Sequence, residues 1–392
     1  MGLFLLAGTA SAKSSEPEKG IRFVTSNLDS LLKESGKTGK LVFVDGYTSW
    51  CGPCKWMAKN VFTNDTVAAF YNEKFHNLKL NMEKGEGPRV SERYNVTGYP
   101  TWLFLDANGE VVHRGIGSMP AQDFIHKLGE VALDPKRNLR GLEKAYKSGE
   151  RGLGLMKEYL SLLASAGLPT AEVFQVYMAA KAESELSSPN MWPMITGFLD
   201  NPDTREFRYL VRHADELSKQ HTVDSVNRLI YSISANYFQS LIQQDSTGKA
   251  FQAGISKLSE LKHQEIEKAK GWAGISMSMR QGKLEEVLTK GDAYFNGVGQ
   301  DFAMQQNQAA WWAFETGAKG KELETIDRWM ERCLALDYSP ANIDTRANIW
   351  YKQGKKAEAI ALEEKAIELA KQNGEPIEGL VETLNLFKTQ KQ

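Results

Sequence analysis

Two of the three cysteines, Cys51 and Cys54, are separated only by a Gly-Pro pair. They follow an apolar run at residues 41–44 that predicts a buried strand, and they open a predicted helix at residues 51–60. A helix N-terminus stabilises a thiolate through its free N–H groups, and this spacing lets the second sulfur reach the first. The pair therefore predicts thiol–disulfide exchange, in which the second cysteine releases a mixed-disulfide partner.

Half of a zinc site is the alternative reading of two cysteines at this spacing. Such a site needs two further ligands, and Cys333 is distant in the sequence. The histidines show no spacing typical of paired metal ligands; they are His76, His113, His126, His213, His221 and His263. We therefore expect no metal and no cofactor, and we interpret Cys333 as a buried structural thiol.

The composition of the chain narrows the function classes further. Its 392 residues suggest two or three domains. With 48 Lys and Arg against 49 Asp and Glu, the net charge of -1 offers no basic surface for nucleic acid or for an anionic membrane. Three cysteines are too few for a disulfide-stapled scaffold, and no apolar run approaches the ~20 residues that a bilayer-spanning helix needs.

The first third of the chain alternates strand-like and helix-like patterns. Further strands are predicted at residues 75–82, 102–105 and 111–112, with Asn108-Gly109 as a hairpin turn. Other helices are predicted at residues 26–34 and from near Asn64 and Ser118, and residues 83–88 are expected to form a solvated polar loop. Parallel strands with crossover helices, followed by an antiparallel hairpin, predict a mixed α/β sheet flanked by helices.

These features together resemble the thioredoxin superfamily over residues 22–132. Asp45 lies six residues before Cys51, where thioredoxins carry a buried acid that manages the proton of the second cysteine. Lys79 matches the lysine beside that acid, and residues 98–101 match the cis-proline loop that faces the cysteines. The resemblance implies that Cys51 is the nucleophile, that Cys54 resolves the mixed disulfide, and that Asp45 assists as a catalytic acid–base group beside Lys79.

The same resemblance implies how a protein substrate would bind. Its chain would pair with the backbone of the cis-proline loop as an added strand. The implied substrate-binding residues are Trp50, Gly52, Pro53, Gly98, Tyr99, Pro100 and Thr101.

The direction of electron flow is predicted from the residues between the cysteines. Residues 61–65 and the long helix after Cys54 resemble exported disulfide reductases, whereas Tyr99 resembles disulfide isomerase domains, which carry His in place of Pro53. The Gly-Pro pair is that of reducing thioredoxins, so a reductase of protein disulfides is predicted, with a dithiol oxidase or isomerase as the alternative. An exported reductase needs a supply of electrons, and the resemblance implies a membrane electron-donor reductase as a partner.

Beyond a predicted linker at residues 133–138, the pattern is helical almost throughout. Residues 350–369 resemble a tetratricopeptide repeat, and aligning Ala366 with Cys333 gives a spacing of 33 residues, close to the period of that family. Residues 139–392 are therefore predicted to be an all-α helical-repeat domain that binds a partner. A different class of function is also open, in which this domain is an interaction scaffold and the thioredoxin-like part is auxiliary.

The N-terminus carries an export pattern. Residues 1–12 combine a short apolar stretch with Ala10-Ser11-Ala12, the small-x-small form of a signal-peptidase site, and a polar linker at residues 13–21 follows. The basic segment that usually opens a signal peptide is missing, as expected if the sequence starts inside a longer one. We expect export, with a bacterial periplasm as the compartment.

Overall fold

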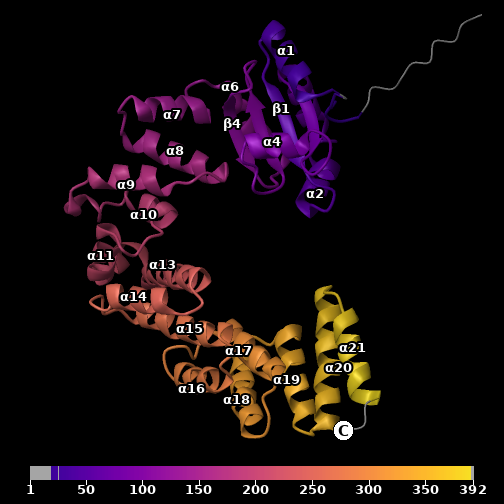
Figure 1. The fold of residues 1–392 in the computed structure, drawn as a ribbon, viewed down its shortest axis with the longest axis vertical. Helices are drawn as coiled ribbons and strands as arrows, with labels where there is room; N and C mark the ends of the chain where they lie inside the picture. The colour runs from indigo at the N-terminus through magenta and orange to yellow at the C-terminus, as the bar shows by residue number, and fades with distance from the viewer. Residues whose placement is uncertain (1–18, 25, 390–392) are drawn as a thin grey trace, which may run out of the picture. The chain divides into compact units, whose positions relative to one another are not determined.

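The computed structural model describes residues 19–24 and 26–389 (Figure 1). The chain divides into two compact units, the first ending at Ala180 and the second beginning at Lys181. The predicted signal peptide and most of the polar linker after it lie outside the described residues. Among the described helices, none is long and apolar enough to cross a bilayer.

The first unit is built on a mixed sheet of four strands among its described residues, in the order β2-β1-β3-β4. The strands are β1 (Val42–Tyr47), β2 (His76–Asn81), β3 (Thr101–Leu105) and β4 (Val111–Ile116). The β1–β2 pair is parallel, whereas β3 is antiparallel to both β1 and β4. The predicted mixed α/β sheet is therefore confirmed, and each predicted strand is found within a few residues of its expected bounds.

Helices cover both faces of this sheet (Figure 1). They are α1 (Leu28–Thr38), α2 (Gly52–Asn60), α3 (Asp65–Lys74), α4 (Gly87–Arg93) and a continuous stretch of α5 (Ala121–Asp123), η1 (Phe124–Gly129) and α6 (Glu130–Leu133). Because strand side chains alternate between faces, Phe43 packs with α2, α3 and η1. Its neighbour Val44 packs with α1 and α4 on the other face.

The observed helix ends differ from the predicted ones for local reasons. The helix predicted at residues 26–34 runs on to Thr38, where Gly39 adopts a left-handed conformation with φ 74° and donates its N–H to Ser35. The helix predicted from Ser118 begins at Ala121, because Pro120 is its N-cap. The helix predicted near Asn64 begins as expected, with the Asn64 side chain accepting from the N–H groups of Thr66 and Val67.

Three further helices belong to the first unit: α7 (Leu139–Lys147), α8 (Leu153–Ser165) and α9 (Ala171–Ala179). Helix α7 packs against β4, an edge strand of the sheet. Asn138 is buried at its start, where its side chain accepts from the N–H of Gly141 and donates to the carbonyl of Ala132. Residues 133–138 therefore make a short, well-bonded connection between α6 and α7.

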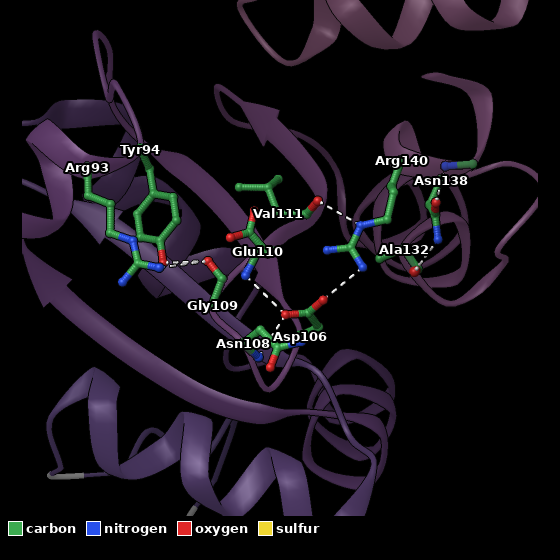
Figure 2. A network of polar contacts seen from close by, with 11 residues as sticks. Arg93, Tyr94, Asp106, Asn108, Gly109, Glu110, Val111, Ala132, Asn138 and Arg140 are labelled. Atoms are coloured by element: carbon green, nitrogen blue, oxygen red, sulfur yellow. Dashed lines mark hydrogen bonds and ion pairs between the residues drawn. The ribbon is translucent and has the colours of Figure 1, made fainter. Parts of the chain in front are cut away.

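A polar network joins α7 to the β3–β4 turn (Figure 2). Arg140 donates to the Asp106 carboxylate at 2.8 Å and to the Val111 carbonyl at 3.3 Å. The other oxygen of Asp106 accepts from the N–H groups of Asn108 and Glu110, which closes the hairpin turn. One guanidinium group thus holds a helix and a turn that are more than 25 residues apart in the sequence.

The described part of the second unit is helical. Its elements are η2 (Glu183–Glu185), α10 (Trp192–Phe198), α11 (Arg205–Arg212), α12 (Ala214–His221), α13 (Val223–Gln244), α14 (Lys249–Leu258), α15 (Gln264–Arg280), α16 (Leu284–Phe295), α17 (Ala303–Thr316), α18 (Lys321–Leu336), α19 (Pro340–Lys352), α20 (Lys356–Asn373) and α21 (Glu378–Thr389). The predicted helical character is confirmed, and Cys333 and Ala366 are both wholly buried, on α18 and α20. The tetratricopeptide assignment stays a prediction.

Replacing Arg140 should loosen α7 from the sheet. We expect Arg140→Ala to lower the free energy of unfolding by about 1 kcal/mol, a modest loss because the Arg140 side chain is partly exposed. The amide protons of α7 should also exchange faster with solvent. Urea denaturation and hydrogen exchange measure the two effects, with Lys147→Ala on the exposed face of α7 as the control. Equal effects of the two substitutions would contradict the bridging role of Arg140.

Candidate active site

The two clustered cysteines lie where β1 leads into α2. Cys51 is the N-cap of α2, and the N–H of Cys54 donates to the Cys51 sulfur at 3.1 Å. The two residues form a disulfide with a Cα–Cα distance of 5.3 Å. Both are buried, at 3% and 6% exposure. The sulfur of Cys51 is therefore placed to receive the positive end of the helix dipole and one backbone hydrogen bond, both of which favour a thiolate after reduction.

Asp45 and Lys79 are direct partners across the parallel β1–β2 pair. The Lys79 ammonium lies 3.3 Å from the Asp45 carboxylate and 4.9 Å from the centre of the Tyr47 ring. Asp45 is 2% exposed, and this burial raises its pKa to about 6, although the charge and hydrogen bond of Lys79 act in the opposite direction. The side chain is thus an acid that changes protonation state close to neutral pH.

The loop before β3 carries the cis bond that the sequence predicts, between Tyr99 and Pro100. The Thr101 hydroxyl donates to the Gly98 carbonyl at 2.7 Å, and the Pro100 carbonyl accepts from the N–H of Gly117 at 2.8 Å. These bonds hold the loop from both of its ends.

Trp50 and Tyr99 form an aromatic rim beside the cysteines. Their rings meet edge to face with centroids 5.9 Å apart, although Trp50 is 65% exposed. The Trp50 indole N–H donates to the Glu83 carboxylate at 2.9 Å. Glu83 lies in the loop that the sequence predicts to be solvated, so its contact with the rim was missed. The position of Glu83, two residues after β2, is the sequence feature that indicates this contact, because β1 and the parallel β2 end at the same edge of the sheet.

The strand pairing explains how the other predicted residues come together. Gly46, near the end of β1, pairs with Thr101 at the start of the antiparallel β3. The cis-proline loop and the segment that leads to Cys51 therefore lie at one edge of the sheet, with Gly52 and Pro53 exposed on the first turn of α2. The described residues contain no group of three or more His, Cys, Asp and Glu side chains that could hold a metal ion.

Comparison with known proteins places this site in a family. Residues 28–132 match the family model of the thioredoxin-like domain. The chain is 33% identical over 97 residues to thioredoxin H-type from Oryza sativa subsp. indica, an alignment that covers 24% of this chain and 74% of that protein. It is 33% identical over 109 residues, or 28% of its length, to the chloroplastic thioredoxin Y of Oryza sativa subsp. japonica, and spans only 59% of that relative.

A solved structure has a related sequence. This solution structure, of a protein proposed to be a disulphide-isomerase from Bacteroides thetaiotaomicron, is 40% identical. The match covers 30% of this chain and 98% of that chain, with a TM-score of 0.28.

Through residues 28–132, the chain belongs to the thioredoxin family. That domain carries a cysteine pair at disulfide distance, the arrangement expected of the thioredoxin-like oxidoreductase family.

The buried acid makes a testable contribution to stability. The pKa of Asp45 is about 6 in the folded chain, against an ordinary value of 3.8, so folding favours the protonated form. Its ionisation therefore destabilises the fold increasingly as the pH rises from about 4 to 6, by up to about 3 kcal/mol for a shift of about two pKa units. We expect Asp45→Asn to unfold at higher denaturant concentration than the unsubstituted protein above pH 6, and at a similar concentration below pH 4.

Chemical denaturation across this pH range measures the difference. Exposed carboxylates titrate in both proteins and cancel in the comparison. A difference in stability that stays constant from pH 4 to pH 7 would show that Asp45 does not titrate in this range.

Proposed function

We propose that this protein reduces disulfide bonds in other proteins through the Cys51–Cys54 pair. The observation that carries the proposal is the position of the Cys51 sulfur at the N-cap of α2, where it accepts the Cys54 N–H. A thiolate is the form of cysteine that attacks disulfides, and this environment favours it.

The reaction would take two steps. The Cys51 thiolate attacks one sulfur of a substrate disulfide, forms a mixed disulfide and expels the other sulfur as a thiolate. Cys54 then loses its proton to Asp45, directly or through water, and attacks Cys51. The substrate leaves as a dithiol. The two electrons that it gains come from the thiols of Cys51 and Cys54, which end as a disulfide. Asp45 suits the proton transfer because its pKa of about 6 lies near neutral pH.

The rim of the site supports binding of an extended protein segment. Trp50 and Tyr99 offer aromatic surface, and the cis-proline loop beside them has backbone groups that could pair with an added strand. Gly52 and Pro53 are exposed on the side where the substrate sulfur would approach.

Reduction is the proposed direction because the residues between the cysteines are Gly and Pro, as in reducing thioredoxins. We also propose export to a bacterial periplasm, supported by the pattern of residues 1–12. In that compartment the dithiol would be regenerated by a membrane electron-donor reductase. Electron flow in the opposite direction, in a dithiol oxidase or isomerase, would require a higher reduction potential of the Cys51–Cys54 pair.

A groove in the second unit supports the proposal that the helical region binds a partner. The groove has a volume of about 570 Å³ and runs over three helices, α13, α15 and α17. Carboxamide side chains and two indoles line it, including Asn236, Gln239, Gln308, Trp272 and Trp312. The charged side chain in its lining is Arg280. Carboxamides pair readily with peptide backbone groups, and indoles offer apolar contact, so the groove suits a peptide segment of a substrate protein.

Substitution of each cysteine should separate the two chemical steps. We expect Cys51→Ser to abolish reduction of insulin disulfides, because no thiolate remains at the helix N-terminus. Cys54→Ser should instead accumulate mixed disulfides through Cys51, which mass spectrometry detects. The control is Cys333→Ser, a buried thiol that should leave the rate unchanged. Full activity of Cys51→Ser would refute the proposal, and a reduction potential of the pair near about -120 mV rather than about -270 mV would assign it to an oxidase.

A second pair of substitutions tests the role of the helical groove. In the Cys54→Ser background, Arg280→Glu should reduce several-fold the yield of partners trapped in the native host, because it reverses the charge of the groove. Arg212→Glu, an exposed arginine on α11 outside the groove, is the matched control. Equal yields from both variants would show that the groove does not recruit substrates. Partners retained without a disulfide bond would favour the scaffold function instead.

A further inference from the structure

Three aromatic rings lie around the ammonium group of Lys79. Its Nζ atom is 4.9 Å from the centre of the Tyr47 ring, 5.2 Å from that of Phe62 and 5.5 Å from that of Phe23. Each distance is within the range at which the face of a ring attracts a cation. The same ammonium lies 3.3 Å from the Asp45 carboxylate. We call the rings of Phe23, Tyr47 and Phe62 the aromatic cage.

The aromatic cage is assembled from segments that are separate in the sequence. Tyr47 is the last residue of β1, Phe62 follows the C-cap of α2, and Phe23 precedes α1. The rings of Phe23 and Phe62 contact each other, with centroids 5.4 Å apart. The N–H of Val24 donates to the carbonyl of Asn77 on β2 at 2.9 Å, which holds Phe23 beside that strand. The rings are therefore fixed by the fold and do not depend on Lys79 for their position.

An ion pair alone would hold Lys79 weakly. Its side chain is 29% exposed, so water competes for the ammonium group. A lysine also loses much rotamer freedom when it keeps to one partner. The aromatic cage offsets these costs because the rings attract the ammonium and offer it no strong hydrogen-bond acceptor in place of Asp45. Lys79 is thus kept charged and close to the carboxylate.

Lys79 supplies the charge that acts on Asp45. Its charge and hydrogen bond lower the pKa of Asp45, against the larger effect of burial. The neighbouring strand β3 consists of uncharged residues. Other titratable groups on the segments around Asp45 are either joined as a disulfide or exposed: Cys51, Cys54, Arg22, Lys55 and Lys59. A change in how Lys79 is held should therefore appear in the titration of Asp45.

We propose that the aromatic cage keeps Lys79 charged and close to Asp45, and thereby sets how readily Asp45 gives up its proton. The three rings are positioning residues, because they act on the carboxyl group only through Lys79. Without one ring, the ammonium would spend more time in water, and the ionised carboxylate would lose part of its stabilisation. The consequence for catalysis rests on the proposed role of Asp45 in taking the proton of the second cysteine.

Carbon-13 NMR of the Asp45 carboxyl group, on the full chain with its disulfide intact, measures the effect. We expect Tyr47→Leu to raise the pKa of Asp45 by about 0.5, because one ring no longer attracts the ammonium. Tyr47→Phe is the matched control, since it keeps the ring and removes only the hydroxyl group, and it should leave the pKa unchanged. An unchanged or lowered pKa in Tyr47→Leu, or equal shifts in the two variants, would overturn the proposal.

A Lys79→Met background shows whether the ring acts through the lysine. The pKa of Asp45 should rise in this background, and adding Tyr47→Leu should then cause no further change. An equal effect of Tyr47→Leu with and without Lys79 would mean that the ring only controls the access of water, and the proposal would be wrong.

A second ring gives an independent test. Phe23→Leu, at a half-buried position, should raise the pKa of Asp45 in the same direction as Tyr47→Leu, and it serves if Tyr47→Leu does not fold. Circular dichroism establishes which variants fold. An unchanged pKa in a folded Phe23→Leu variant would remove that ring from the aromatic cage and contradict the proposal. Because each readout is a titration of the oxidised chain, it can fail or succeed independently of disulfide reduction.

Discussion

Asp45 is a carboxyl group with 2% exposure on a strand whose neighbours are mostly apolar. Burial of an acid without a partner is strongly unfavourable, and the ammonium of Lys79 at 3.3 Å offsets only part of that cost. The pairing depends on the register of β1 and β2, because a slip of one residue would turn one of the two side chains to the opposite face. The same register brings the strand ends to the edge where Cys51 lies, so one alignment of two strands positions both the sulfur and the acid.

The helices after the thioredoxin-like domain depend on a second set of polar contacts. Arg140 reaches Asp106 and Val111, and the Leu139 N–H reaches His113, so α7 is bonded to β4 and to the turn before it. An edge strand normally exposes unpaired groups and invites association with other chains. Here α7 packs against that strand. Helix α8 also contacts β4, so the sheet, α7 and α8 lie in one compact unit.

Local patterns predicted much of the site but little of what surrounds it. Cys51 and Cys54 were found from their spacing between a strand and a helix, and Asp45, Lys79 and the cis-proline loop from their resemblance to one family. Those signals lie within short segments. The contact between Glu83 and Trp50 and the hydrogen bond from the Leu139 N–H to His113 depend instead on segments brought together by the fold. The sequence predicts that the region after residue 138, which includes α7, is helical, but this pattern carries no information about which strand α7 covers.

The three cysteines show how position alone changes the chemistry of one side chain. Cys333 lies inside α18, where no free N–H groups remain, and its S–H donates to the Ala303 carbonyl at 3.3 Å. Burial raises the pKa of this thiol to about 12, so its reactive thiolate is scarce at neutral pH. Cys51 is buried to a similar degree, but it is the N-cap of α2 and accepts a backbone N–H instead of donating to a carbonyl. Burial is thus common to both sulfurs, and the helix N-terminus distinguishes the redox cysteine from the structural one.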